Sequence, residues 1–375
     1  MSYQEVKITE LQPGSYVVQV VLQSGDVIVK HAGWVRSADA IAQLQRKGVR
    51  AVLIDPDKKW HDDVETLPAE PVSQPAAETA KALFADEQPK AERVLLQTQK
   101  VQRQVQDAVR SGNPIDLTLV HEVSAGLAES VSRNQDVLLC LGRIAQQSDT
   151  LLQHSINCAV YMAAFARYLN LAADKIQTLI TAALLHDIGK DLSDAALHAP
   201  DHQAIPASLN ALSKTRNLAG DVSLWISQHC AHLDGSGIPK ITSAQIDKHS
   251  RMLAIVNNYE NLTSAHTGKL GPLAASRQLL ERAPLQLDNE LLQQFIKCIG
   301  IYPPGSVVKL SSGKLALVLE NNPKKPLLPK VKVFYHSSHQ HHIPPKVIDL
   351  SRQQEEQIDS CVELKKYGLE VRNYL

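Results

Sequence analysis

Residues 184–190 read LLHDIGK, and they place a histidine and an aspartate side by side at the end of an apolar segment. Upstream of the pair, apolar residues recur at helical spacing, and Asp187 continues the same face. This pattern predicts a buried helix that ends in the His-Asp pair, with Gly189 as its stop. Because a buried carboxylate is costly without a partner, the pattern also points to a metal ion.

The side chains of this stretch fit a metal centre. Imidazole and carboxylate groups on neighbouring residues can serve one metal, and the carboxylate can bridge to a second. Lys190 would then supply a positive point charge suited to a phosphate. Taken alone, a His-Asp pair at a helix end more often only caps the helix or forms hydrogen bonds. Three further segments favour the metal interpretation.

Two of these segments are expected to be helices. Residues 153–157, QHSIN, open a helix rich in alanine, and small side chains would let His154 approach the pair. Residues 255–264, IVNNYENLTS, read as an apolar helix whose polar residues face one way. Taken alone, His154 is more often a hydrogen-bonded core histidine.

The third segment, residues 229–239, reads HCAHLDGSGIP. His229 follows an apolar stretch at residues 222–226, so we expect it at a helix end, like the histidine of the first stretch. Gly235 and Gly237 allow backbone conformations closed to other residues and let the chain approach a ligand.

Together and in this order, these segments resemble the HD-GYP family, a branch of the HD phosphohydrolases whose members cleave cyclic di-GMP. Residues 302–308, YPPGSVV, look like the family's strand-rich tail, and LQPG at residues 11–14 is similar to the small uncharacterised domain that often precedes it. The resemblance covers nearly the full chain. It implies a mainly α fold: an HD-type helical bundle with a small N-terminal α/β domain and a short β-rich C-terminal tail.

The resemblance also implies cofactors, a substrate and site residues. Family members hold two or three divalent metals, usually iron or manganese, and cyclic di-GMP or a related cyclic dinucleotide is the implied substrate. The residues at metal-ligand positions are His154, His186, Asp187, His202, His229, Cys230 and Asn257. Catalytic roles fall to Asp187 and Lys190. The positions expected to contact substrate are Lys190, Asp234, Gly235, Gly237 and Lys269.

Several positions depart from the family pattern. The differences are Thr150 for a glutamate, Cys230 for a histidine, Ala231 for a glutamate, Asn257 for a carboxylate, Ile238 for a tyrosine, and HTGK at 266–269 for an Arg-Pro-Tyr-Arg run. An amide at 257 removes a negative ligand, and lysine replaces bidentate arginine by a point charge. Cys230 either binds as a thiolate, which favours zinc, or is a buried thiol that binds nothing.

Two hypotheses about function follow. The first is slow, metal-dependent hydrolysis of cyclic di-GMP, which the core residues of the expected metal site motivate. The second is an inactive HD-GYP-like domain that senses a nucleotide or recruits a signalling protein without turnover. The departures at positions 230, 231, 238 and 257 motivate the second.

Composition narrows the class of protein. Lys plus Arg equals Asp plus Glu at 39 each in 375 residues, which argues weakly against a DNA-binding protein. The five cysteines are odd in number and form no close pair, so a reducing compartment, the cytoplasm, is expected. No stretch approaches the roughly 18 apolar residues of a membrane span, and the N-terminus lacks the apolar core of a signal peptide.

Changes in composition and apolar pattern along the chain predict its division into domains. Residues 1–62 read as the small α/β domain, and 63–114 as a linker and a long polar helix that is either exposed or forms a homodimer. Residues 115–303 read as the helical HD-GYP-like domain, and 304–375 as the β-rich tail and C-terminal segment. Within the tail lie His336, His339, His341 and His342. Such a cluster can bind metal, although a solvated loop is the more common interpretation.

Overall fold

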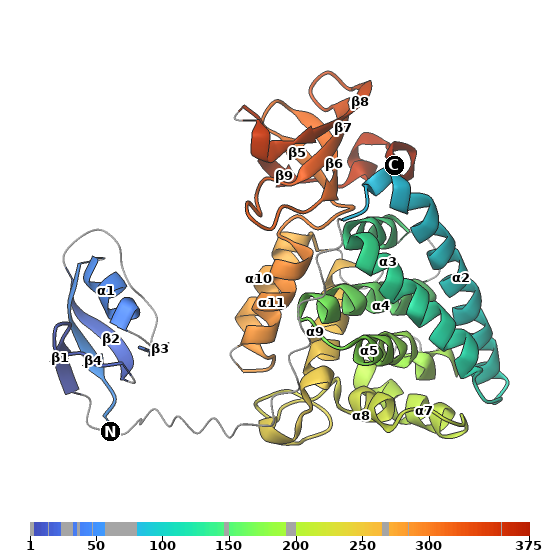
Figure 1. The fold of residues 1–375 in the computed structure, drawn as a ribbon, viewed down its shortest axis with the longest axis horizontal. Coiled ribbons are helices and arrows are strands. Elements are labelled where there is room, and N and C mark those ends of the chain that lie inside the picture. Colours follow the sequence, from blue (N-terminus) through green and yellow to red (C-terminus); the bar gives the residue numbers. More distant parts are fainter. Residues whose placement is uncertain are drawn as a thin grey trace. The chain divides into compact units, whose positions relative to one another are not determined.

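The computed structural model describes residues 4–13, 15–23, 33–35, 38–46, 48–56, 81–145, 150–192, 200–264, 270–283, 285–353 and 355–375. The chain divides into two compact units, residues 1–72 and 73–375 (Figure 1). Each is described by itself.

Among its described residues, the N-terminal unit consists of a four-stranded sheet and one helix. Its strands are β1 (Gln4–Lys7), β2 (Tyr16–Gln23), β3 (Gly33–Trp34) and β4 (Val49–Ile54), in the order β1-β4-β2-β3, and all pairs are antiparallel. Helix α1 (Ala38–Arg46) ends before Gly48, whose φ of +80° lies in the left-handed region. The predicted α/β character is confirmed. The sequence VIV at 27–29 also predicts a strand, but these positions lie outside the described residues.

The long polar helix of the sequence is α2 (Phe84–Arg110), and it belongs to the second unit. It lies along α3 (Leu117–Ile144; Figure 1) and buries a stripe that recurs every three or four residues. One polar member of that stripe, Glu87, accepts bonds from Ser130 and Arg133 of α3. The stripe is therefore used against α3 of the same chain rather than exposed.

The helical body surrounds α4 (Thr150–Tyr168). Residues 151–166 of this helix are buried on every side, against α3, α5 (Ala173–Leu185), α9 (Lys248–Thr263) and α11 (Asn289–Ile299). Its alanines contribute to the close packing predicted for this segment. The remaining elements are η1 (Ile188–Leu192), a short 3₁₀ helix, then α7 (Asp201–Ser213), α8 (Gly220–Gln228), η2 (Ser243–Gln245) and α10 (Pro272–Arg282).

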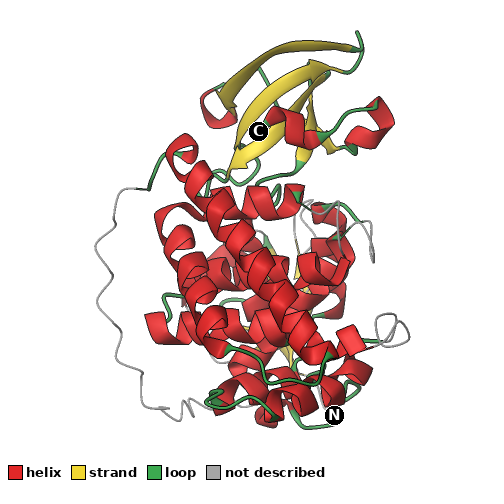
Figure 2. Cartoon of the chain, turned by 90° about the vertical axis from the view of Figure 1, so that its right-hand side faces the viewer, coloured by secondary structure: helices red, strands yellow, loops and turns green. Residues whose placement is uncertain are grey.

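The C-terminal segment forms a five-stranded antiparallel sheet at one end of the helical body (Figure 2). Its order is β8-β7-β6-β5-β9, with β5 (Val307–Leu310), β6 (Lys314–Glu320), β7 (Lys330–His336), β8 (His341–Asp349) and β9 (Ile358–Cys361). Three short 3₁₀ helices follow or interrupt it: η3 (Leu350–Arg352), η4 (Leu364–Tyr367) and η5 (Val371–Tyr374). Cys140 and Ile144 of α3 share an apolar cluster with strands β6 and β7, which joins sheet and helices.

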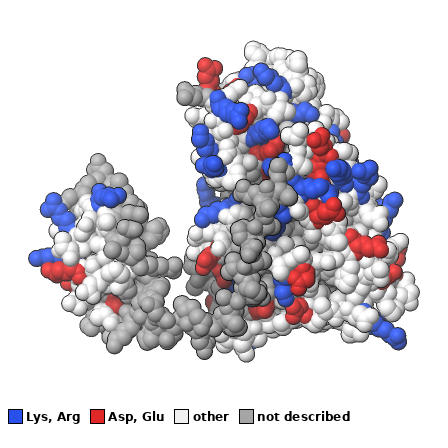
Figure 3. All heavy atoms as spheres, viewed as in Figure 1, with Lys and Arg blue, Asp and Glu red and all other residues white. Residues whose placement is uncertain are grey.

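The surface carries both signs of charge. On the face of the larger unit seen in Figure 3, lysine and arginine side chains are interspersed with aspartate and glutamate. Among the described helices, none combines the length and apolar character required to cross a membrane.

Candidate metal centre

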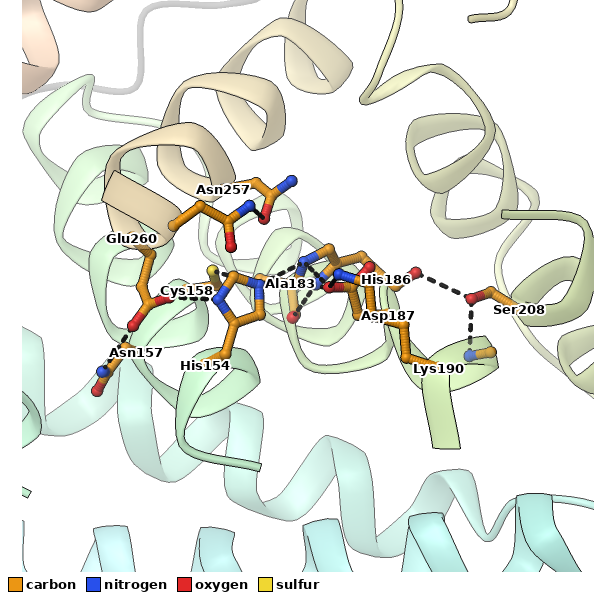
Figure 4. A network of polar contacts seen from close by, with 12 residues as sticks. His154, Asn157, Cys158, Ala183, His186, Asp187, Lys190, Ser208, Asn257 and Glu260 are labelled. Carbon is orange, nitrogen blue, oxygen red and sulfur yellow. Dashed lines mark hydrogen bonds and ion pairs between the residues drawn. The ribbon is translucent and has the colours of Figure 1, made fainter. Parts of the chain in front are cut away.

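Three helix ends and one helix face meet in the middle of the helical body. Figure 4 labels residues from the ends of α4 and α5 and from the face of α9. His154 comes from α4, and His186 and Asp187 directly follow α5. The Nε2 atoms of His154 and His186 are 3.2 Å apart, and Asp187 Oδ2 lies 3.4 Å from the first and 3.6 Å from the second. His229, which follows α8, completes the cluster with Asp187 and His186. These residues are buried.

The two histidines at helix ends are fixed by the helices that they terminate. The last carbonyl groups of a helix lack an intrahelical partner. His186 Nδ1 donates to the carbonyl of Ala183 at 2.8 Å, and His229 Nδ1 donates to the carbonyl of Ile226 at 2.7 Å. Because a carbonyl only accepts, Nδ1 carries the proton in both rings. Each Nε2 therefore presents a bare lone pair to the cluster, which is the form that binds metal.

Neighbouring side chains form hydrogen bonds with the backbone of the turn that carries His186. Gln102 of α2 donates to the carbonyl of Leu184 at 2.6 Å, and Ser208 of α7 donates to the carbonyl of His186 at 3.1 Å. The same Ser208 hydroxyl accepts from the backbone of Gly189 at 2.9 Å. A Cβ on Gly189 would lie 2.6 Å from the nitrogen of Ser208, so only glycine permits this approach. Close packing, rather than helix termination, thus explains Gly189.

Glu260 of α9 holds the third ring. Its carboxylate accepts from Nδ1 of His154 and, through its other oxygen, from the amide of Asn157 at 3.2 Å. Glu260 is buried and was not predicted from the sequence. The signal available was its position three residues after Asn257, which puts both side chains on one face of α9.

Electrostatics favour a cation between these groups. Burial lowers the pKa of His186, to about 4, and its neighbours His154 and His229 act in the same direction. Burial would raise the pKa of Asp187, but His186, His154 and Lys190 outweigh it and hold that pKa well below its usual value. The cluster therefore combines a neutral imidazole with a fixed carboxylate charge.

The raised pKa of His154 also indicates that a positive charge is favoured in this cluster. Burial would lower its pKa, but Cys158, Glu260 and Asp187 outweigh burial and raise the pKa well above its usual value. A proton held on His154 balances the two carboxylates, which is the electrostatic task of a cation at this position.

Two buried atoms test whether a metal fits. Asp187 Oδ1 and His229 Nε2 make no hydrogen bond to any described residue. An unsatisfied buried polar atom costs about 1–3 kcal/mol. Both atoms are acceptors, so a cation placed between them would satisfy them together. The donor set of imidazole nitrogens and a carboxylate fits a divalent transition metal.

Comparison with known proteins agrees with this geometry. Residues 140–291 match the model of the HD domain, residues 3–120 match a domain of unknown function named DUF3391, and residues 307–369 match a KOW domain associated with the HD domain. The cyclic di-GMP phosphodiesterase PA4108 of Pseudomonas aeruginosa is 30% identical over 373 residues, which covers 92% of this chain and 89% of that protein. The chain belongs to the HD-GYP family.

Other relatives are more distant. The cyclic di-GMP phosphodiesterase PdeB of Borreliella burgdorferi is 26% identical over 53% of this chain and 54% of its own length. The 3′3′-cGAMP-specific phosphodiesterase 1 of Vibrio cholerae is 28% identical over 41% of this chain and 38% of its own length. Among solved structures, an HDG"Y"P protein of Bdellovibrio bacteriovorus, Bd1817, matches with a TM-score of 0.48 and 14% identity over 78% of this chain and 98% of that one.

The HD-GYP centre gathers four of the seven predicted ligands directly. These are His154, His186, Asp187 and His229. Asn257 is buried one turn before Glu260 on α9 and points toward the cluster, where its oxygen accepts from Asn261 at 3.2 Å (Figure 4).

The other two predicted ligands are not in the groups of converging ligand atoms. Among the described residues, those groups contain neither His202, which is half-buried on α7, nor Cys230. They do contain Cys158, whose sulfur lies 3.7 Å from Nε2 of His154. Cys158 was not predicted, although it follows His154 by one helical turn. Burial raises the pKa of its thiol to about 11.

The predicted substrate positions of the HD-GYP site behave differently from one another. Lys190 is nearly buried, and its ammonium group lies 2.6 Å from Asp187 Oδ2. Asp234 caps its own turn by accepting from the nitrogen of Ser236 at 2.9 Å, and Gly235 has a φ of +76°. A Cβ on Gly237 would meet the Cys230–His232 backbone, so this glycine permits a close approach of the chain to itself. Lys269 lies outside the described residues.

Proposed function

We propose that the chain is a metal-dependent phosphodiesterase that hydrolyses cyclic di-GMP or a related cyclic dinucleotide, with weakened turnover. The observation that carries the proposal is the arrangement of three imidazoles whose Nδ1 atoms are held by a carbonyl or a carboxylate. Their Nε2 atoms converge with one buried aspartate. Relatives over nearly the whole chain or half of it are named cyclic di-GMP phosphodiesterases, which supports this substrate class.

His154, His186, Asp187 and His229 would hold two divalent metals, iron or manganese, with zinc as the alternative that Cys158 or Cys230 would favour. Asn257 would add a neutral amide oxygen. Metals in such a site act as Lewis acids toward a phosphoryl oxygen and lower the pKa of bound water. His202 is a ligand in this proposal only if its side chain turns inward.

Lys190 has two tasks in the proposed mechanism. Its ammonium group neutralises Asp187 at 2.6 Å and so keeps that carboxylate ionised in a buried place. When the charge of Asp187 is balanced in another way, the same ammonium is within reach to steady a phosphate oxygen of the substrate. By the family resemblance, the positions from Asp234 to Gly237, together with Lys269, would contact the substrate.

Weakened turnover follows from the differences in charge. Asn257 carries no charge where the family has a carboxylate, so the site has one negative ligand fewer. Ala231 and Ile238 remove two further polar groups. Loss of one ligand or supporting group typically costs about 10- to 100-fold in affinity or activity. We further propose that the protein acts in the cytoplasm, where its five free cysteines would remain reduced.

The test is a cleavage assay on full-length protein purified without a histidine tag. Iron- or manganese-loaded protein is incubated with cyclic di-GMP, and linear products are separated by chromatography. We expect slow cleavage that scales with metal content, about two metals per chain, and loss of both in Asp187→Ala and Asp187→Asn. Asp221→Asn is the matched control, because Asp221 is an exposed aspartate on α8 paired with Lys175 at 2.9 Å.

The alternative is a domain that binds without turnover. It is favoured by the Lys190–Asp187 ion pair and by the amide at 257, which both reduce the charge available to a metal. Cyclic di-GMP binding without cleavage, measured by calorimetry on metal-loaded protein, would replace the enzymatic proposal by a sensor. Neither binding nor cleavage would leave recruitment of a signalling protein as the function.

A further inference from the structure

A second cluster of histidines lies at the far end of the C-terminal sheet, in the hairpin that joins β7 and β8 (Figure 1). His336 ends β7 and faces His341, the first residue of β8, as its antiparallel partner. His339 stands in the turn between them. Cross-strand partners have adjacent side chains, so the hairpin brings three imidazoles to one place. The proposed phosphodiesterase activity uses none of them.

The ring centres in the hairpin lie about as far apart as those of the buried centre. The ring centre of His336 lies 4.4 Å from that of His339 and 6.0 Å from that of His341, and the last two are 6.0 Å apart. In the core, the ring of His186 lies 5.2 Å from His154 and 5.4 Å from His229. Zinc binds imidazole nitrogen at about 2.0–2.1 Å, which places neighbouring ring centres roughly 5 Å apart. The hairpin distances bracket that value. The groups of described residues whose ligand atoms converge within 4.8 Å lie in the core, so the exposed His339 and His341 side chains would have to turn toward His336 to share one ion.

The three rings are also free of competing roles among the described residues. His336 Nδ1 is buried and makes no hydrogen bond there. The fourth histidine, His342, is different, because it pairs with the hydroxyl of Tyr374 at 3.2 Å. His339 and His341 are exposed, so a metal can enter from solvent.

The charges around the hairpin permit a cation. Lys314 faces His336 across β6 and β7, but its ammonium group lies 2.9 Å from the carboxylate of Glu356. Slight burial, together with His339, His341 and Lys314, lowers the pKa of His336. This ring is therefore neutral at neutral pH, as a metal ligand must be.

We propose that His336, His339 and His341 form a second metal site, which takes one Zn²⁺ per chain. Three imidazoles from one hairpin leave the fourth tetrahedral position to water or to a small ligand. The ion would link the ends of β7 and β8, and it would be independent of the buried centre.

The test is zinc binding by calorimetry to untagged full-length protein that carries both His186→Gln and Asp187→Ala. Both changes are needed, because Asp187→Ala alone would leave three imidazoles in the core, and His186 belongs to both core groups of ligand atoms. We expect about one zinc per chain at low micromolar concentration. His336→Gln, His339→Gln and His341→Gln should each weaken binding about tenfold or more. His342→Gln is the matched control and should change it less than twofold. His339 and His341 are exposed, so their variants should fold normally, as circular dichroism would verify.

Three outcomes would overturn the site. One is no zinc binding in the His186→Gln/Asp187→Ala chain at this concentration. Another is binding that none of the three substitutions weakens, or that His342→Gln weakens equally, which would mean diffuse surface binding. The third is zinc binding only with dimerisation in light scattering, which would mean that the ligands come from two chains. Loss of zinc in the hairpin variants with unchanged cyclic di-GMP cleavage in the otherwise wild-type chain would confirm independence from the core.

Discussion

The buried and the surface histidine clusters have nearly the same ring spacing but different surroundings. In the core, each Nδ1 is held by a carbonyl or carboxylate, and the Nε2 atoms meet a carboxylate. In the hairpin, no carboxylate belongs to the three rings among the described residues, and two of the rings are exposed. The core therefore combines ring spacing with fixed tautomers and a negative charge excluded from water, which metal-dependent chemistry needs, whereas the hairpin offers ring spacing alone.

The largest difference between the two clusters should appear when one ring is removed from the core. His186→Gln removes the ring that both groups of ligand atoms share. We expect metal content to fall and cyclic di-GMP cleavage to drop about 100-fold or more, since a first ligand is lost. The matched substitution His342→Gln in the sheet should leave both within twofold. Elemental analysis and the cleavage assay measure the two effects, and an unchanged metal content in His186→Gln would contradict the proposed centre.

A smaller effect should follow from removing the support of a ring. Glu260→Gln keeps an acceptor for Nδ1 of His154 but removes the charge that orients it. We expect metal affinity and kcat to fall about 10- to 100-fold, with KM little changed. Glu129→Gln is the control, because Glu129 is a surface carboxylate in an ion pair with Arg133. Equal metal affinity in Glu260→Gln and wild type would mean that the charge of Glu260 does not support metal binding.

A third substitution tests the close packing around Gly189, next to the buried cluster. Gly189→Ala places a methyl group against the backbone and hydroxyl of Ser208. We expect the free energy of unfolding to fall by about 1–3 kcal/mol, as for other overpacked sites. Gly220→Ala should change it by less than about 0.5 kcal/mol, since nothing lies within 4 Å of a Cβ there. Urea denaturation measures both, and equal stability of the two variants would refute the close-packing argument.

The smallest expected effect is a shift in a titration. Slight burial and the neighbouring rings lower the pKa of His336, whereas burial and its neighbours lower that of His186 to about 4. As the pH falls, His336 should take up its proton below the ordinary range, near 6.5. The double variant His339→Gln/His341→Gln removes two like charges and should move the midpoint back upward. Histidine resonances in NMR report both midpoints, and an unmoved midpoint would show that the rings do not interact.

The sequence predicted the frame of the core because its signals are local. Apolar runs that end in a histidine predicted both helix ends, and the structure places His186 and His229 as the residues that follow α5 and α8. The β-rich runs at 307–310, 315–319 and 331–334 also predict strands, and they correspond to β5, β6 and β7. Convergence of His154 on the pair depended on close-packed alanines, which are visible in the sequence of α4.

The buried polar residues that the sequence did not reveal form contacts with partners distant in the chain. The polar residues of α2 suggested exposure, yet Glu87 and Gln102 are buried because Arg133 and the carbonyl of Leu184 satisfy them. In the sequence, Glu260 is one of several polar residues in an apolar helix. Its role depends on His154, which lies 106 residues earlier in the chain and donates to its carboxylate. Strand β8 was not predicted, because two adjacent prolines within it are typical of loops.

Those prolines have a consequence for how the molecule behaves among its own copies. Pro344 and Pro345 lie in β8, an edge strand of the sheet, where the pairing register with β7 shifts. Neither residue offers an amide hydrogen, so the outer side of β8 presents an interrupted row of donors to any approaching chain. An edge of this kind is a poor template for strand addition, and it protects the exposed end of the sheet from aggregation.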